Sequence, residues 1–267
     1  MLPILPVATP ASARLPRWYE YVCLVLGLGF LGLMCLGWTP IAALLNVVMP
    51  EDAGRRLGRR VISGGFNAYL RWLEWLGACR FDLDELDTLR AAGPLVLAPN
   101  HPCLLDAVMV ISRLPDVACI MKASLMDNLF LGGGARLARY IRNKPVLGMA
   151  HGAVDDLKRG SLLLVFPEGT RTVRSPINRC QPTTALIARR AKVPVQTLLI
   201  ETDSAYLSKG WSLFRRPDMP IRYRVRLGAR FDPPRDGAEF AAQLERYFAD
   251  ELSRAELVPP PCPAAST

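Results

Sequence analysis

No charged residue occurs between Glu20 and Glu51, and this constrains the fold more than any other feature of the chain. Tyr21–Leu36 is almost entirely apolar, Gly37–Pro40 interrupts the apolar run, and Ile41–Met49 continues it. A helix of about 20 apolar residues is long enough to cross the hydrocarbon core of a bilayer. The sequence therefore predicts a membrane-embedded element near the N-terminus.

Two arrangements of this element are open. One is a single tilted transmembrane helix kinked at Pro40; the other is a helical hairpin that enters one leaflet and turns near Gly37–Pro40. A secretory signal is disfavoured because its apolar region is only about 7–15 residues long. Positive flanks mark cytoplasmic sides, so cations at both ends favour the hairpin or a shallow insertion over a single crossing. The flanking cations are Arg14, Arg17, Arg55, Arg56, Arg59 and Arg60.

A basic amphipathic segment, Ala53–Gly77, follows the apolar stretch. A helix of this composition binds an anionic lipid interface or packs on a domain, and the two roles are compatible. Its apolar and interfacial residues are Val61, Phe66, Tyr69, Leu70, Trp72, Leu73, Trp75 and Leu76, and its cations are Arg55, Arg56, Arg59, Arg60 and Arg71.

The chain as a whole is basic, with a net charge of +9. A charge of this sign favours nucleic acid or an anionic membrane as the partner. The sequence contains neither zinc-ligand spacing nor a nucleic-acid-binding motif. Because an apolar anchor is present, we predict anionic membrane lipids as partners, no nucleic acid and no metal. The seven cysteines include no CxxC pair, which fits reduced cytoplasmic thiols.

The first chemically informative segment is Asn100-His101-Pro102-Cys103-Leu104-Leu105-Asp106. It follows a predicted buried strand at Leu95–Ala98. We expect Asn100 to cap a helix and Pro102 to begin it. His101 in the turn would then meet Asp106 in the first helical turn, which gives a proton acceptor oriented by a carboxylate. The alternative is a hydrogen-bonded pair with a purely structural role.

The second segment is Pro167-Glu168-Gly169-Thr170-Arg171-Thr172, which follows a predicted buried strand at Ser161–Phe166. Gly169 allows a tight turn and a close approach to a ligand. Arg171 presents a planar fork suited to phosphate oxygens, and amides around Thr170 add donors. Glu168 is expected to pair with Arg171 or to accept from a substrate hydroxyl. A surface turn with a solvated ion pair is the alternative.

Together, NHPCLLD and FPEGTRT resemble the glycerolipid acyltransferase family, whose signatures NHxSxxD and FPEGTRS occur in this order about 60–80 residues apart. The resemblance covers roughly residues 80–201. It implies an α/β fold, in which a mixed, largely parallel sheet is flanked by helices, here preceded by the membrane-embedded hairpin or single helix. It implies that His101 is the general base and that Asp106 orients it. The residues implied to bind the acceptor's phosphate or headgroup are Glu168, Gly169, Thr170 and Arg171.

Weaker family segments add two candidate substrate-binding lysines. Cys119–Lys122 resembles a strand that ends in lysine, and Tyr140–Lys144 lies where the family has an apolar strand ending in Asp-Arg. Lys122 and Lys144 are therefore predicted to bind substrate. A lysine cannot reproduce a bidentate arginine contact, so Lys144 leaves room for a different acceptor.

Two further departures bear on the chemistry. Cys103 replaces the family serine, which leaves open a cysteine nucleophile and an acyl-enzyme route. Thr197 replaces a proline in Val193–Thr197, which resembles the family's late VPVxP strand. We therefore expect the acyl-transfer chemistry to be kept while the acceptor can differ.

The chain divides into four predicted regions. Residues 1–18 form a flexible N-terminus, 19–78 a membrane-associated helical region, 79–257 the α/β acyltransferase domain, and 258–267 a disordered tail. Within the domain, alternating arginines in Ile221–Leu227 predict a half-exposed late strand. The apolar face of Ala238–Leu257 predicts a final helix packed on the domain.

The resemblance implies a membrane-associated O-acyltransferase of phospholipid biosynthesis at the cytoplasmic (inner) membrane, with its active site facing the cytoplasm. The acyl donor would be acyl carrier protein or a CoA thioester, used as co-substrate without another cofactor. The acceptor would be a lysophospholipid, with 1-acylglycerol-3-phosphate favoured. The alternatives are a lyso-aminolipid, a specialised or pigment lipid, and a lipid-binding membrane module without catalysis.

Overall fold

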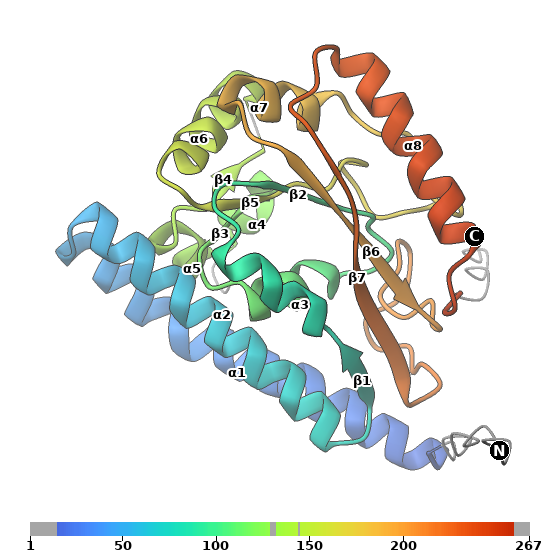
Figure 1. The fold of residues 1–267 in the computed structure, drawn as a ribbon. Helices are drawn as coiled ribbons and strands as arrows, with labels where there is room; N and C mark the ends of the chain where they lie inside the picture. The colour runs from blue at the N-terminus through green and yellow to red at the C-terminus, as the bar shows by residue number, and fades with distance from the viewer. Residues whose placement is uncertain (1–14, 129–131, 144, 259–267) are drawn as a thin grey trace, which may run out of the picture.

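The computed structural model describes residues 15–128, 132–143 and 145–258. Seven strands form one sheet, in the order β1-β7-β6-β2-β5-β3-β4, between two layers of helices (Figure 1). Only β6 and β7 are antiparallel neighbours among the strands described, which confirms the predicted mixed, largely parallel α/β fold. The strands are β1 (Cys79–Asp82), β2 (Val96–Pro99), β3 (Val117–Met121), β4 (Ile141–Arg142), β5 (Leu162–Leu164), β6 (Val195–Thr202) and β7 (Ile221–Phe231).

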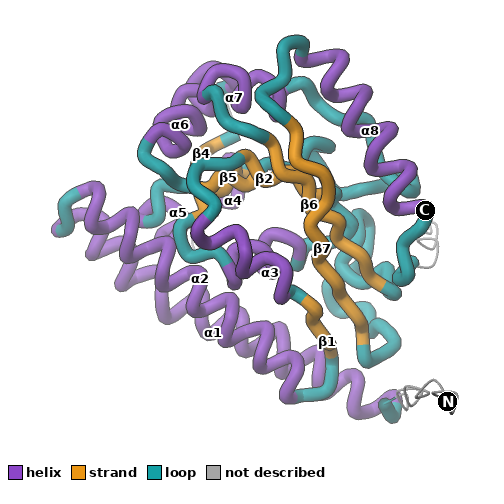
Figure 2. Tube along the Cα trace, in the orientation of Figure 1, coloured by secondary structure: helices purple, strands orange, loops and turns teal. Residues whose placement is uncertain are grey.

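Helices cover both faces of the sheet (Figure 2). One hydrophobic core joins the sheet to α1, α2 and α3, and a second core joins it to α6, α7 and α8. The helices are α1 (Arg17–Val48), α2 (Glu51–Trp75), the 3-10 helix η1 (Asp84–Ala91), α3 (Asp106–Arg113), α4 (Ala123–Met126), α5 (Gly132–Leu137), α6 (Val146–Lys158), α7 (Thr183–Ala191) and α8 (Gly237–Ser253).

The N-terminal apolar stretch forms one continuous helix, α1, with Pro40 inside it. The predicted hairpin with a turn near Gly37–Pro40 is therefore wrong. The chain turns instead at Met49, which is extended, with φ −93° and ψ 146°, because the following Pro50 disfavours a helical conformation at the residue before it. The resulting hairpin pairs α1 with the amphipathic α2.

Among the described residues, α1 is the one helix long and apolar enough to cross a membrane, judged by length and composition. Its inner face packs tightly on the domain: a Cβ at Gly27 would lie 3.0 Å from Leu73 of α2, and one at Gly133 of α5 would lie 2.8 Å from the Thr39 carbonyl oxygen. Its outer face exposes large apolar side chains. They are Trp18, Tyr21, Val22, Val25, Leu26, Leu33, Leu36, Ile41, Leu44, Val47 and Val48.

Two of the arginines predicted to lie on the polar face of α2 are buried. Arg59 is 1% exposed and donates to Asp156 at 2.9 Å, Asp116 at 3.1 Å and the Ala138 carbonyl at 3.1 Å. Arg55 also donates to Asp156, at 3.0 Å. These ion pairs compensate the desolvation of the guanidinium groups. Arg55 and Arg59 therefore attach α2 to the domain, and Arg56, Arg60 and Arg71 remain exposed.

The C-terminal elements follow the predicted pattern with shifted ends. Along β7, Tyr223 and Val225 are buried while Arg222 is exposed, as the alternation predicts. Helix α8 ends at Ser253, four residues before the predicted end at Leu257. The flexible N-terminus was predicted for residues 1–18 and the disordered tail for 258–267, and of these residues 1–14 and 259–267 lie outside the described residues. Arg17 and Trp18, at the end of the predicted flexible segment, are instead the first residues of α1.

Candidate active site

Both motifs lie at one edge of the sheet. The parallel strands β2, β3, β5 and β6 all have their carboxyl ends there, and His101 follows β2 while Glu168 follows β5. This edge of an open α/β sheet is a common position for a ligand site. The strand pairing of β2 with β5 therefore explains why residues 67 positions apart in the sequence meet.

His101 and Asp106 are in contact. The Nδ1 atom of His101 lies 2.7 Å from Oδ2 of Asp106, whose side chain is fully buried. Oδ2 also accepts from the Cys103 backbone N–H at 2.8 Å, so the carboxylate is held in one orientation. With Nδ1 directed at the carboxylate, Nε2 is the ring nitrogen left for a substrate.

The His101 ring is supported on one face by Phe166. The two ring centroids are 3.8 Å apart at an interplanar angle of 20°. The side chain of His101 is 16% exposed, so part of the imidazole remains accessible. Stacking and the Asp106 contact together restrict the ring to one orientation.

The predicted capping role of Asn100 is wrong. Helix α3 begins only at Asp106, and Asn100 instead forms two hydrogen bonds with Ile200 of β6. Its Nδ2 donates to the Ile200 carbonyl at 2.9 Å, and its Oδ1 accepts from the Ile200 N–H at 2.7 Å. The side-chain amide thus takes the place of a backbone partner and fixes the turn that carries His101.

Glu168 links the two motifs. Its Oε1 accepts from the His101 N–H at 2.9 Å and from Thr172 Oγ1 at 2.8 Å, and Oε2 accepts from the Asn178 N–H at 2.9 Å. Burial raises the pKa of Glu168, and these hydrogen bonds oppose the rise. The expected pairing with Arg171 is not seen among the described residues, because protein donors occupy this carboxylate.

The neighbouring loop residues have separate environments. Gly169 has φ +67° and its N–H donates to the Phe166 carbonyl at 3.0 Å, so this amide closes the turn and is not free for a ligand. Thr170 is exposed. Arg171 Nη1 donates to the carbonyls of Leu207 and Ser208, at 2.8 and 2.9 Å, and so ties the loop to the segment after β6.

Of the two predicted lysines, the structure describes only Lys122. Lys122 follows β3 at the same edge of the sheet and is exposed. Lys144 lies outside the described residues. Its neighbour Asn143 accepts from the Ala123 N–H at 3.1 Å, which joins the ends of β3 and β4.

Cys103 faces Asp106. Its Sγ lies 3.0 Å from Oδ1 of Asp106, and the residue is 1% exposed. Burial raises the pKa of the Cys103 thiol well above its usual value, and the Asp106 charge raises it further. A neutral, buried thiol that donates to a carboxylate is a poor nucleophile, so this geometry is against the acyl-enzyme alternative.

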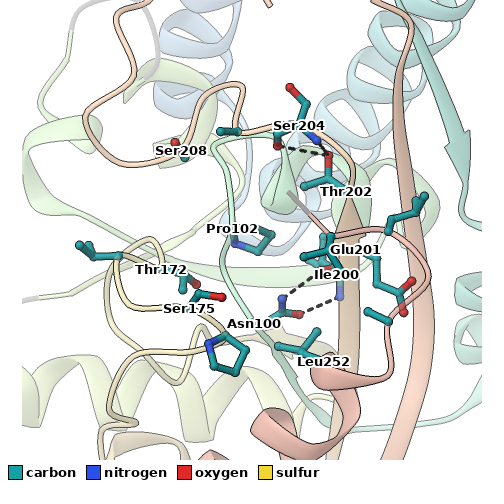
Figure 3. Close-up of a pocket in the computed structure, with 16 residues that line it drawn as sticks. Asn100, Pro102, Thr172, Ser175, Ile200, Glu201, Thr202, Ser204, Ser208 and Leu252 are labelled. Atoms are coloured by element: carbon teal, nitrogen blue, oxygen red, sulfur yellow. Dashed lines mark hydrogen bonds between the residues drawn. The ribbon is translucent and has the colours of Figure 1, made fainter. Parts of the chain in front are cut away.

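A cavity of about 280 Å³ opens near the turn that carries His101, and Figure 3 shows its lining residues. It touches both sequence neighbours of His101, Asn100 and Pro102, and it is bounded by Thr172, Thr202 and Leu252. Hydroxyl groups, apolar side chains and the acidic residue Glu201 therefore line this cavity.

The sequence model of the Acyltransferase family matches residues 80–201, which contain both motifs. The part of the chain that carries both motifs is thus an acyltransferase domain. It is 24% identical to human 1-acyl-sn-glycerol-3-phosphate acyltransferase beta over 65% of this chain and 63% of that protein. It is 25% identical to the Saccharomyces cerevisiae 1-acyl-sn-glycerol-3-phosphate acyltransferase over 61% of this chain and 56% of that protein. The match thus spans less than two thirds of either relative.

The fold of the chain is similar to a solved structure. The crystal structure of the 1-acyl-sn-glycerophosphate (LPA) acyltransferase PlsC from Thermotoga maritima aligns with a TM-score of 0.67 at 16% sequence identity. The alignment covers 89% of this chain and 96% of that one. At this level of sequence identity, the similarity establishes a shared fold.

Sequence reasoning missed several residues that organise the site. Phe166 lies within the second motif, but nothing in the motif indicated stacking on His101. Asn178 donates from its backbone to Glu168 and from Nδ2 to the Arg171 carbonyl at 3.1 Å. Leu207 contributes only its carbonyl, and a backbone acceptor has no signal in the sequence.

Proposed function

We propose that the protein is a membrane-associated O-acyltransferase of phospholipid biosynthesis. It would transfer a fatty acyl group from acyl carrier protein or CoA to a lysophospholipid hydroxyl, with 1-acylglycerol-3-phosphate favoured as acceptor. The observation that carries this proposal is the His101–Asp106 contact of 2.7 Å, in a loop joined to the second family motif through Glu168. A pure binding module has no need of a buried carboxylate that orients an imidazole.

The proposed reaction is a direct transfer. Nε2 of His101 takes the proton of the acceptor hydroxyl while its oxygen attacks the thioester carbonyl. The C–O bond forms, the C–S bond breaks, and the imidazolium returns its proton to the leaving thiolate. Asp106 stabilises the imidazolium and fixes the tautomer, as the carboxylate of a serine hydrolase triad does.

The acceptor headgroup is proposed to bind in the cavity bounded by Thr172 and Thr202. This position is supported by the contact of the cavity with Asn100 and Pro102, which flank the proposed base. Arg171 is proposed as the cation nearest to an acceptor phosphate. Lys122, at the same edge, is proposed to contact the donor or the acceptor.

The membrane position is proposed to be shallow. Helix α1 is about 48 Å long at 1.5 Å per residue, and its inner face is packed on α2 and α5 from Gly27 to Thr39. A crossing of the bilayer would separate it from both helices. We therefore propose that its outer face lies in the cytoplasmic leaflet of the inner membrane, with the site facing the cytoplasm.

The test is acyl transfer by the purified protein, free of other acyltransferases, with lysolipid acceptors and both thioester donors, read by mass spectrometry. His101→Ala and Asp106→Asn should reduce turnover by about 10²–10⁴-fold, the usual contribution of general base catalysis. Turnover by His101→Ala at the wild-type rate would contradict the mechanism. No transfer by the wild-type protein to any lipid would favour the binding module.

A different acceptor is the second candidate. It is favoured by Arg171, whose Nη1 is already bound to two backbone carbonyls and is less available to a phosphate. A lyso-aminolipid or another hydroxylated lipid would then replace the lysophosphatidic acid. The same screen distinguishes them through the ratio of kcat/KM for the phosphate-bearing and amine-bearing acceptors.

A further inference from the structure

The connection between β6 and β7 packs on the first turns of α1. Met219 donates its backbone N–H to Oε1 of Glu20 at 2.9 Å, and Arg216 forms an ion pair with the same carboxylate. The Arg216 guanidinium also lies 5.7 Å from the centroid of the Tyr21 ring. In Figure 1 this connection lies at the same end of the molecule as the start of α1. The two segments therefore present one continuous surface.

That surface exposes large apolar and aromatic side chains. The exposed fractions are 76% for Phe214, 45% for Leu213, 69% for Trp18 and 54% for Tyr21. Clusters of this kind on a soluble domain mark sites of interaction with a protein or a membrane. We call Trp18, Tyr21, Leu213, Phe214 and Arg215 the loop surface.

The loop surface includes one cation, Arg215, and a second, Arg17, directly precedes Trp18 in the chain. Arg215 and Arg17 are both exposed, and neither forms an ion pair with a carboxylate of the described residues. The Arg215 guanidinium lies 4.5 Å from the centroid of the Trp211 ring, which holds it beside the apolar group. Arginine next to tryptophan and phenylalanine is the composition that binds an anionic lipid interface.

We propose that the loop surface binds the headgroup layer of an anionic bilayer and forms a second membrane contact beside the outer face of α1. The charge of Arg215 and Arg17 and the continuity with α1 favour lipid over a protein partner. The inference rests on the membrane association proposed above, and it adds a contact made by a loop of the catalytic domain.

The loop surface is joined to the site by a short path. Trp211 packs edge-to-face on Tyr206, with ring centroids 6.0 Å apart, and Leu207 follows Tyr206. The Leu207 carbonyl accepts from Arg171 at 2.8 Å and from the Leu104 N–H at 3.2 Å. The second membrane contact thus lies a few residues from the backbone that holds both motifs.

The experiment measures binding of the full chain to vesicles of phosphatidylcholine alone and with about 30% phosphatidylglycerol. Arg215→Gln should weaken binding to the anionic vesicles about fivefold and leave binding to neutral vesicles unchanged, since one cation near such a surface has roughly that effect. Arg190→Gln is the matched control, because Arg190 is exposed at the far end of α7 and gives the same change of net charge. Equal effects of the two substitutions would overturn the proposal.

Hydrogen exchange in residues 209–217 of the wild-type protein gives a second readout. Anionic vesicles should slow exchange in this peptide by at least severalfold relative to lipid-free protein in mild detergent. Unchanged exchange would overturn the inference even if α1 alone keeps the protein on the vesicles. Neither readout uses turnover, so failure here leaves the proposed acyl transfer intact, and absence of turnover leaves this contact intact.

Discussion

At the residue scale, the site depends on how the oxygens of one buried carboxylate are occupied. Oδ2 of Asp106 faces His101 and the Cys103 N–H, and Oδ1 faces the Cys103 thiol. A fully buried carboxylate without such partners would be strongly destabilised. Cys103 therefore acts on His101 through Asp106, which gives the departure from the family serine a positioning role.

Substitution of Cys103 separates positioning from nucleophilic catalysis. Cys103→Ser keeps a donor to Asp106, so we expect turnover within about threefold of wild type. Cys103→Ala removes the donor, and the loss of roughly 1–2 kcal/mol predicts a decrease of about tenfold in kcat. The measurement is kcat with a saturating acceptor. Complete loss of activity in both variants, with a trapped acyl-enzyme in wild type, would instead identify Cys103 as the nucleophile.

Glu168 is expected to be required for stability as well as for the site. In Glu168→Gln, the side-chain amide would place a donor against at least one of three protein donors, which predicts a loss of about 1–3 kcal/mol. Because burial raises the folded-state pKa of Glu168, the stability it contributes is fully present below its unfolded pKa of about 4.3 and decreases as pH rises through the folded pKa.

The difference in unfolding free energy between wild type and Glu168→Gln should therefore shrink between pH 4.5 and pH 7. Urea denaturation in a mild detergent at the two pH values measures it. Thr170→Ser is a suitable control, since Thr170 is exposed in the same loop and does not titrate. A difference that grows with pH would contradict the assigned direction of the pKa shift.

At the element scale, α2 approaches the end of α5 closely enough to require glycine. A Cβ at Gly58 would lie 2.7 Å from the Ala138 backbone nitrogen and 2.9 Å from its Cα. The backbone of α5 cannot move away easily, because the Ala138 carbonyl also accepts from buried Arg59. The hairpin of α1 and α2 is thus fixed to the domain by a close backbone contact and an adjacent ion network.

Two glycine substitutions on the same helix test this contact. Gly58→Ala should destabilise the protein by about 1–3 kcal/mol through overpacking. Gly64→Ala has no atom within 4 Å of the new Cβ, so it should stabilise α2 by up to about 1 kcal/mol. Thermal unfolding of the two variants should show changes in unfolding free energy of opposite sign. A stabilising Gly58→Ala would mean that α5 moves freely relative to α2.

At the scale of the whole molecule, the apolar outer face of α1 should decide where the protein resides. Replacement of Leu33 and Leu44, both exposed, by lysine removes apolar area and adds charge to the face proposed to enter the leaflet. We expect the double variant to shift from the membrane fraction to the soluble fraction of lysed cells. Leu147→Lys, at an equally exposed position on α6, should remain with the membrane. Unchanged membrane association of the double variant would contradict the proposed placement.

Much of the fold and the dyad could be predicted, because their signals are local. The buried strand before His101, the spacing to Asp106 and the alternation along Ile221–Leu227 depend on neighbouring residues. The role of Asn100 could not be predicted, because its partner Ile200 is 100 positions away in the sequence. The burial of Arg59 could not be predicted either, because its partner Asp156 lies 97 positions further along the chain. From the sequence alone, arginines on an amphipathic helix are assigned to the surface, because the distant carboxylates that pair with them in the interior cannot be identified.

The pairing of β1 with β7 has a consequence for the order of events during synthesis. Cys79 pairs with Ile221, so more than half of the chain emerges from the ribosome after β1 and before its partner strand. Asp116 and Asp156, which receive the buried guanidinium of Arg59, also appear well after α2. The newly made α1 and α2 therefore expose their apolar faces until the later strands and helices of the domain have been synthesised. At the membrane position proposed above, a bilayer surface beside the ribosome would shelter these faces until the sheet closes.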